Sequence, residues 1–551
     1  MEQAVEIPRQ PLASMCEGPR FHHMDRLEAY YRGAQDDAKS YDWDGRFRGY
    51  QFSSVAPGWE VPLSQRRPNA RYELARIVVS RLTNMSLGGE AWPDINVEGD
   101  PDAQDYVRAL AKASDLQARL AEARSLGGAT GTACLSLGFV EGCPRIETHN
   151  AKHCLVLTWE DMATFRPQQV LKAYSFKRPK IDPQDGKVKL MTFWYARYWD
   201  TEREIIWREI PQRVAKLPTW ADWVGPDGAG RREMRHGYGF TPFYWIQNLP
   251  DSQELDGLGD YEGQTDMLDQ FNQLLSSTVK GAIANVDPTL VVMDDPESNE
   301  GHLQKGSGAA IYSKGGAKYL ELEGSAIRAA RELLTDLREM FLDAAQVVLP
   351  QAEKLTSKAQ SAAAMRIVYQ PMMARCDQLR DQYGEGGLVL ILTDMLRVAR
   401  QIEEAPPELI ELEDGTREER KPSVTLPPRQ DDDGEERPHV PGKGENVTLN
   451  WAPYFSPTMQ DLKAAAETAQ LAGGGQPLIS HRSAVEFVAR HFGVEDVEKE
   501  LAEMAVEADE RAERAAEMFG DEGPRPAGSE QGSPNTPQQP PKGDKPPKSE
   551  D

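Results

Sequence analysis

The sequence has few cysteines and no long apolar run. Its five cysteines are scattered over 551 residues without a C-x-x-C pair, so neither a disulfide framework nor a zinc knuckle is indicated. No apolar stretch approaches the roughly 18 residues that cross a membrane, and the first residues lack the apolar core of a secretory signal. We therefore expect no membrane partner and, by default, a reducing intracellular setting.

Positive charge is also scarce. The chain has 63 Lys and Arg against 88 Asp and Glu, a net charge of −25. Tight, extended binding to nucleic acid needs clustered cations, so this balance argues against it. It does not argue against a surface that lets DNA pass without adhering. Taken alone, the acidity is explained most simply by solubility.

A convincing catalytic motif is missing as well. The S-x-x-K pattern at Ser277–Lys280 falls in a helical stretch and lacks the partner motifs of penicillin-binding enzymes. The Gly-rich run at Gly127–Thr132 lacks the Gly-Lys-Ser/Thr ending of a phosphate-binding loop and predicts a turn before a strand. No carboxylate pair stands out. We expect no enzymatic activity, cofactor or metal. His22 and His23 have no Cys or further His nearby in sequence, and His149 and His153 lie in a strand-rich region without a helical i, i+4 face.

Two stretches of heptad-like apolar spacing are the most informative feature. They run from about Tyr261 to Asn285 and from Ser325 to Val348, and they predict two long helices that pack along one another. Short β-type runs lie between them at Thr289–Met293 and Ala309–Tyr312. The expected packing residues are Leu268, Phe271, Leu275, Ile327, Leu334, Leu337, Phe341 and Val348.

A helix out, a small β cap and a helix back make a projecting hairpin, from which a ring of subunits can build a channel wall. Without further support, an antiparallel helix pair inside a monomer is the commoner explanation, because such pairs are frequent core elements.

The part before the hairpin, to about Leu249, predicts an α+β domain with an antiparallel meander. We expect helices at 21–33, 72–85 and 102–123, a break at Gly127, Gly128 and Gly131, and strands at 134–140, 153–158, 170–176, 191–198 and 204–207.

After the hairpin, a long helical region from Ala362 to Ile402 is expected to kink or break at Pro371 and at Gly384, Gly386 and Gly387. The acidic, Pro-rich residues 406–446 predict a linker, Val447–Trp451 a strand, and 520–551 a disordered tail. Between this strand and the tail, helices are expected at 458–471, 480–492 and 496–518.

In this order, these features resemble the portal proteins of tailed bacteriophages, over about residues 21–519. Five segments carry the resemblance: the strand before the hairpin, the first hairpin helix, the entry to the β cap, the segment after the second helix, and the C-terminal strand with its helices. These are Phe240–Ile246, Gly257–Gly263 with Met267–Ser277, Asp287–Val292, Leu355–Ala363, and Asn446–Ser456 with Ile479–Phe487. Each motif is degenerate, and the ordered set is what is similar; the acidic stretch after residue 405 looks long for the family.

The resemblance implies an α+β portal fold with an α/β wing, a helical-hairpin stem, a small β-containing clip and a helical crown. The implied segments are a disordered N-terminus (1–20), wing (21–255), stem helix 1 (256–285), clip (286–324), stem helix 2 (325–348), tunnel loop (349–361), long kinked wing helix (362–405), linker (406–446), strand and crown helices (447–519) and disordered tail (520–551).

The resemblance also implies a function: a ring, usually of twelve subunits, at one capsid vertex of the virion, assembled in the host cytoplasm. DNA would be packaged and ejected through it. Implied partners are further copies of the chain, the terminase large subunit, a head–tail adaptor, the major capsid and scaffolding proteins and, transiently, double-stranded DNA. Twelve acidic copies would carry roughly 300 negative charges and repel the duplex. Lys354 and Lys358 in the tunnel loop are the candidate DNA contacts.

Two other readings stay open. The chain could be a different ring-forming or head–tail scaffold component of a virion, without DNA transit. It could also be an enzyme whose site leaves no motif in the sequence.

Overall fold

The structure is a computed structural model whose described residues fall into two units, Met1–Ser456 and Pro457–Asp551. The described residues are 15, 18–33, 70–161, 164–181, 188–211, 231–252, 254–286, 289–292, 317–320, 325–349, 362–411, 417–430, 436–455, 463, 466–468, 485 and 504–506. In the second unit the structure describes only residues 463, 466–468, 485 and 504–506, all of them helical. The crown helices and the C-terminal tail that we expected therefore lie largely outside the described residues.

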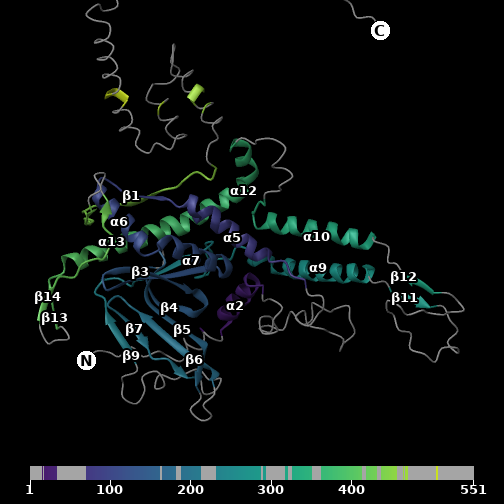
Figure 1. Ribbon diagram of the computed structural model, residues 1–551, viewed down its shortest axis with the longest axis horizontal. Helices are drawn as coiled ribbons and strands as arrows, with labels where there is room; N and C mark the ends of the chain where they lie inside the picture. Colours follow the sequence, from purple (N-terminus) through teal and green to yellow (C-terminus); the bar gives the residue numbers. More distant parts are fainter. Residues whose placement is uncertain are drawn as a thin grey trace, which may run out of the picture. The chain divides into compact units, whose positions relative to one another are not determined.

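The first unit mixes helices and antiparallel sheets, as the α+β prediction required (Figure 1). Its N-terminal helices are α2 (Pro19–Tyr31), α5 (Leu74–Leu87), α6 (Pro101–Ala113) and α7 (Leu116–Thr130), with short 3-10 turns at Gly89–Ala91 and Ala151–His153. The single helix expected over 102–123 is wrong. The chain turns between α6 and α7 at Asp115, whose φ of 52° is incompatible with a continuous helix.

The glycine break that we expected at Gly127 and Gly128 is also wrong, because both residues lie inside α7. The break expected at Gly131 is confirmed, because the helix ends there, in the left-handed region with φ 94°. A Cβ at Gly131 would lie 2.0 Å from the carbonyl oxygen of Gly257. Glycine is therefore needed there both for backbone conformation and for close approach of the chain that leads into the hairpin.

Two antiparallel sheets follow. A three-stranded sheet has the order β10-β2-β3, with β2 at Thr132–Val140, β3 at Cys143–Asn150 and β10 at Phe243–Gln247. The larger sheet has the order β4-β5-β6-β7-β9, and β8 pairs with β6. Its strands are β4 (Cys154–Asp161), β5 (Arg166–Ile181), β6 (Val188–Trp199), β7 (Arg203–Trp207), β8 (Ile210–Pro211) and β9 (Arg231–Arg235). The meander β4 to β7 was predicted, whereas β3, β8 and β9 were not.

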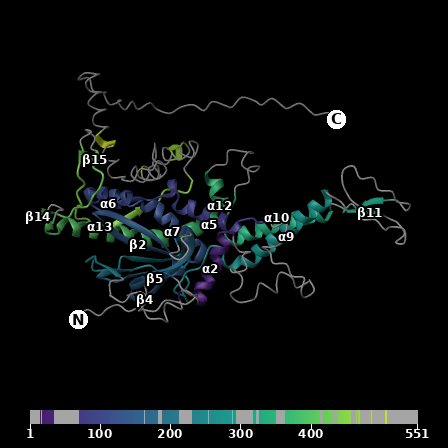
Figure 2. The same ribbon diagram turned by 60° about the horizontal axis from the view of Figure 1, so that its bottom comes forward.

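The two heptad stretches form helices that lie side by side (Figures 1 and 2). A 3-10 turn at Glu262–Gln264 leads into α9 (Thr265–Val286), and α10 spans Ser325–Ala344. Between them β11 (Thr289–Val292) pairs antiparallel with β12 (Ala317–Leu320). The strand predicted at Ala309–Tyr312 lies outside the described residues, and β12 was not expected.

The second helix ends four residues before the expected Val348. Gln346 has φ 55°, the amide of Val347 donates to the carbonyl of Leu342 at 2.9 Å, and that of Gln346 donates to the carbonyl of Asp343 at 3.0 Å. These two bonds and the left-handed residue form a Schellman motif, with glutamine where glycine is usual. The motif ends the helix before Pro350 can.

The long helical region is continuous where we expected a kink or a break, so the expected break is wrong. It consists of α12 (Ala362–Arg380), a π-helical segment (Asp381–Leu388) and α13 (Val389–Glu404), and Pro371 lies within α12. The glycines serve close packing: a Cβ at Gly384 would lie 2.5 Å from the Trp451 ring, and one at Gly387 would lie 2.6 Å from Ile246 Cδ1. The π-helical turns keep the backbone bonded through the glycine run.

The prediction of a linker over 406–446 is wrong for its described parts. They contain the strand pairs β13 (Glu408–Glu411) with β14 (Arg417–Arg420), and β15 (Arg429–Gln430) with β16 (Glu436–Arg437). The end of this stretch is held by Asp100, whose carboxylate accepts from the amides of Lys443 and Gly444 at 2.7 and 2.8 Å. Strand β17 (Val447–Asn450) then pairs antiparallel with β1 (Asp94–Val97). The C-terminal strand thus completes the first unit.

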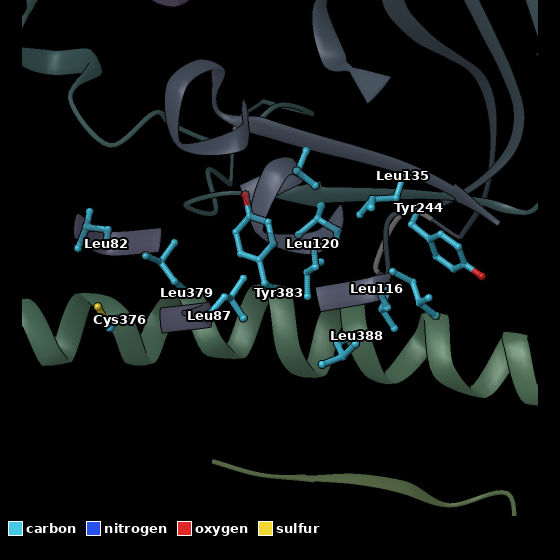
Figure 3. Packing of buried hydrophobic residues seen from close by; sticks show 14 of the residues in the cluster. Leu82, Leu87, Leu116, Leu120, Leu135, Tyr244, Cys376, Leu379, Tyr383 and Leu388 are labelled. Atoms are coloured by element: carbon cyan, nitrogen blue, oxygen red, sulfur yellow. The ribbon is translucent and has the colours of Figure 1, made fainter. Parts of the chain in front are cut away.

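One buried apolar cluster joins these parts (Figure 3). It includes residues from the long helix, the N-terminal helices, the three-stranded sheet and the root of the hairpin, among them Leu82, Leu116, Leu135, Tyr244, Leu379, Tyr383, Leu388, Phe271 and Phe341. The hairpin is therefore anchored in the main core and not attached through a separate one. None of the helices that the structure describes is both long and apolar enough to cross a bilayer.

Candidate functional site

The helical hairpin α9–α10 is the candidate functional element, and its seam is made by the heptad residues. Leu268, Phe271 and Phe341 are buried at the root. Leu275, Leu334, Leu337 and Val348 are partly buried and pack against the same cluster. Ile327 is half-buried farther out, where a Cβ at Gly281 would lie 4.0 Å from its Cγ1. Seven of the eight predicted packing residues thus belong to or pack against one buried cluster, Ile327 is outside it, and Val348 lies beyond the end of α10.

A second, polar stripe of α9 fixes the hairpin to the N-terminal part of the chain. Asp269, Asn272 and Ser276 are spaced by three and four residues and are all buried. Tyr30 Oη donates to Asp269 Oδ2 at 2.8 Å, the amide of Tyr72 donates to Asn272 Oδ1 at 3.0 Å, and Ser276 Oγ bonds the backbone of residue 70. This stripe could not be recognised in the sequence, because polar residues at helical spacing ordinarily indicate a solvated face.

The loop before α9 is held by two acidic residues. Asp256 accepts two bonds from the Arg20 guanidinium, at 2.6 and 2.9 Å, and one from Thr132 Oγ1 at 2.9 Å. Arg20 lies in α2, so the disorder that we expected over 1–20 is wrong for Pro19 and Arg20, and most of the earlier residues lie outside the described ones. This bidentate pair fixes the loop to both α2 and β2.

The second acidic residue, Asp260, forms a fully buried ion pair with Arg124. Arg124 Nη1 lies 2.9 Å from Asp260 Oδ2, and both side chains are 0% exposed. Asp260 Oδ1 also accepts from Asn248 Nδ2 at 3.0 Å, and Asn248 Oδ1 accepts from the hydroxyl of Tyr383 at 3.1 Å. The network links α7, the loop before α9 and the π-helical segment (Tyr383 is labelled in Figure 3).

The outer faces of the hairpin expose apolar side chains. Leu333 and Met340, one heptad apart on α10, are 48% and 56% exposed, and Ile283 on α9 is 55% exposed. Their neighbours on α10 are mostly charged, so these residues interrupt a polar surface. Exposed apolar positions at heptad spacing suit packing against a further helix.

The predicted DNA contacts Lys354 and Lys358 lie outside the described residues, as does the loop 350–361 that contains them. The structure describes the two ends that this loop joins, Leu349 after α10 and the start of α12. The two lysines therefore remain predictions from the sequence.

The candidate catalytic and metal-binding residues do not form a site where they are described. Ser277 and Lys280 are exposed on α9. His23 Nε2 lies 2.6 Å from Glu262 Oε1. Within the described part of the chain, no group of three or more His, Cys, Asp or Glu side chains could hold a metal ion.

His149 joins a serine and a lysine in an arrangement that only superficially resembles a catalytic dyad. Its Nε2 lies 2.8 Å from Ser136 Oγ and its Nδ1 lies 2.8 Å from Lys172 Nζ. The ammonium group of Lys172 donates to Nδ1, which puts the ring proton on Nε2, where it is donated to Ser136. Burial and the nearby cations Lys172 and Arg197 lower the pKa of His149 well below its usual range. A ring in this state does not take a proton from Ser136, so the serine is not activated.

No protein-family model matches the sequence, and no curated protein matches it significantly. Among solved structures, the chain is similar to one from the virion of a native gene transfer agent particle, at 14% identity and a TM-score of 0.30 over 59% of this chain and 76% of that one.

Proposed function

We propose that this chain is the portal protein of a tailed phage or a phage-like particle, forming a ring at one capsid vertex through which DNA is packaged and ejected. The observation that carries the proposal is the hairpin α9–α10. Its root is buried in the main core, a two-stranded β pair lies between its helices, and its outer faces expose apolar residues at heptad spacing. A lone subunit leaves those residues in water, whereas a ring of hairpins covers them.

In this proposal the hairpin is the stem, β11 and β12 belong to the clip, residues 349–361 are the tunnel loop, and the domain built around the two larger sheets is the wing together with α12 and α13. The copies form a ring, usually of twelve. The terminase large subunit, a head–tail adaptor, and the capsid and scaffolding proteins bind it. Its net charge of −25 per subunit repels the duplex and keeps contact with DNA transient.

The ring is tested by negative-stain electron microscopy and light scattering of the purified full-length chain. We expect rings with a central hole. Leu333→Glu with Met340→Glu places two charges on the outer face of α10 and should give monomers with an unchanged circular dichroism spectrum. Val440→Glu, at a residue 57% exposed outside the hairpin, is the matched control and should leave rings intact. A monomeric wild-type chain, or rings from the double variant, would contradict the proposal.

DNA transit needs a separate test, because a ring with a hole need not conduct DNA. Lys354→Glu with Lys358→Glu should allow rings to form but shorten the DNA packaged in particles, because the loop loses its cations. Lys112→Glu with Lys443→Glu changes the same charge at two exposed residues elsewhere and should not affect packaging. Full-length packaged DNA in the first variant would remove these lysines from the mechanism.

A further inference from the structure

The first unit contains a cavity of about 1450 Å³. Its walls come mainly from β2 and β3 of the three-stranded sheet, from β5, β6, β7 and β9 of the larger sheet, and from residues 421–425. The segment 421–425 is fixed to the turn between β2 and β3, because the amide of Thr425 donates to the carbonyl of Gly142 at 3.0 Å. None of the described residues that line the cavity belongs to α9 or α10, so it is separate from the hairpin.

The cavity has an excess of positive charge. Among the described residues that line it, six side chains are cationic and three are carboxylates. The cations are Arg145, Lys172, Arg197, Arg232, Arg235 and Lys421, and the carboxylates are Glu141, Glu147 and Glu204. The whole chain carries a net charge of −25, so this wall has the opposite sign to the rest of the protein. A concave surface lined by one sign of charge concentrates its field and favours a ligand of the other sign, here an anion.

Three of these cations hold the wall together. Arg197 pairs with Glu204 at 2.7 Å and also with Glu147, and Arg145 pairs with Glu147 at 3.0 Å. The ammonium group of Lys172 donates to the buried imidazole described above. These three already have partners and are not contacts for a ligand.

Arg232 and Lys421 are the cations of the wall that can bind a ligand. Both side chains are exposed, and neither forms a hydrogen bond or an ion pair with a residue that the structure describes. Arg232 lies on β9, whereas Lys421 directly follows β14, so the fold brings them to one cavity from separate elements. A guanidinium presents a planar fork of donors that matches phosphate, and an ammonium binds phosphate as a point charge.

Tyrosine rings form another part of the wall. Tyr174 and Tyr195 lie directly opposite one another on β5 and β6, with ring centroids 5.3 Å apart, and each is half-buried. Burial raises the pKa of both tyrosines, so their hydroxyls stay protonated and can donate hydrogen bonds. Flat rings with a donor at the edge suit the stacking of a planar, polar group such as a nucleobase.

We propose that this cavity binds a nucleotide, with the phosphates at Arg232 and Lys421 and the base against Tyr174 and Tyr195. The charge of the chain favours a small ligand over a nucleic acid, because the acidic surface repels an extended polyanion, whereas a ligand inside the cavity meets the local excess of positive charge. The cavity is large enough for a nucleotide, since small-molecule sites span about 300–1,000 Å³. An acidic peptide would use the cations but not the rings. The inference does not rest on the portal proposal.

The test measures binding of adenosine triphosphate to the purified full-length chain by isothermal titration calorimetry. Arg232→Gln with Lys421→Gln, at two exposed residues, should weaken binding by about tenfold or more, because charge-assisted hydrogen bonds to phosphate are lost. Lys112→Gln with Arg366→Gln removes one lysine and one arginine at exposed residues outside the cavity and should bind like wild type. The proposal is overturned if wild type does not bind the nucleotide, or if the first pair behaves like its control.

A second ligand separates the base from the phosphates. Adenosine triphosphate should bind about fivefold or more tightly than inorganic triphosphate, because stacking of the base is added. Tyr174→Leu should remove most of that difference and leave the affinity for inorganic triphosphate unchanged. Melting temperatures are measured alongside, and if Tyr174→Leu fails to fold, the two ligands compared on wild type decide the base contact. Equal affinity for both ligands, a folded Tyr174→Leu protein that binds the nucleotide normally, or equally tight binding of a polyglutamate peptide or an oligothymidylate would contradict the proposal.

Discussion

Replacing Asp260 by asparagine tests whether the hairpin is held by the buried ion pair at its root. Asp260 Oδ2 lies 2.9 Å from Arg124 Nη1, and neither side chain is exposed. None of the three guanidinium nitrogens of Arg124 has a hydrogen-bond partner among the described residues, so the carboxylate is its principal compensation. Asp260→Asn keeps the size of the side chain and leaves a cation buried without a partner. Breaking a buried pair in this way costs about 3–5 kcal/mol of unfolding free energy.

The assay is urea unfolding followed by tryptophan fluorescence. With an m value of about 3 kcal/mol/M or more, the midpoint should fall by about 1 M. Asp266→Asn is the control, because it removes the same charge from a side chain that is 82% exposed in the first turn of α9 and should shift the midpoint little. Adding Arg124→Met to Asp260→Asn should recover part of the loss, since no buried charge then remains. An Asp260→Asn protein within about 1 kcal/mol of wild type would refute the reasoning.

Three further outcomes follow from single residues. Gly131→Ala should lower the unfolding free energy by about 2 kcal/mol or more, because Gly131 has φ 94° and the added Cβ would meet the Gly257 carbonyl at 2.0 Å; an unchanged urea midpoint would contradict this. Gln346→Gly should raise the unfolding free energy by about 1 kcal/mol, since glycine adopts φ 55° without strain, and a lower melting temperature would count against the Schellman assignment. Burial, with Lys152 nearby, lowers the pKa of His153 from 6.5 to about 4, so the unfolded chain binds the proton first and the unfolding free energy should fall as the pH drops from 6.5 toward 4. His153→Gln should make the fall in urea midpoint between pH 7 and about pH 5 shallower. An equal fall in the variant would show that His153 does not cause this pH dependence.

The helices of the hairpin could be predicted because their evidence is local. Apolar residues at alternating spacings of three and four indicate a helix with one packing seam, whatever the rest of the chain does. The meander from β4 to β7 was also predictable from its β-branched and aromatic runs. The boundary at Ala344 was not, because Gln346 in a left-handed conformation has no signature in the sequence, where glycine would have been one.

Glycine was the residue most often misinterpreted. Gly127 and Gly128 were predicted to break the chain, and Gly384 and Gly387 to kink or break a helix, yet all four lie inside helical segments. At Gly128 a Cβ would lie 2.1 Å from Arg124 Nη1, so the glycine makes room for the buried ion pair. Whether a glycine ends a helix or admits a neighbour depends on what packs against it, and local sequence does not contain that information.

By itself the sequence determined the two amphipathic rods, the α+β class of the first unit and the acidity of the surface, because periodicity, propensity and charge are properties of short stretches or of composition. Only the tertiary structure decided that polar Asp269, Asn272 and Ser276 face inward, that Val447–Asn450 pairs with Asp94–Val97, and that Arg232 and Lys421 line one cavity. Each of these joins residues distant in the chain, and a side chain's role is then set by its partner across that distance.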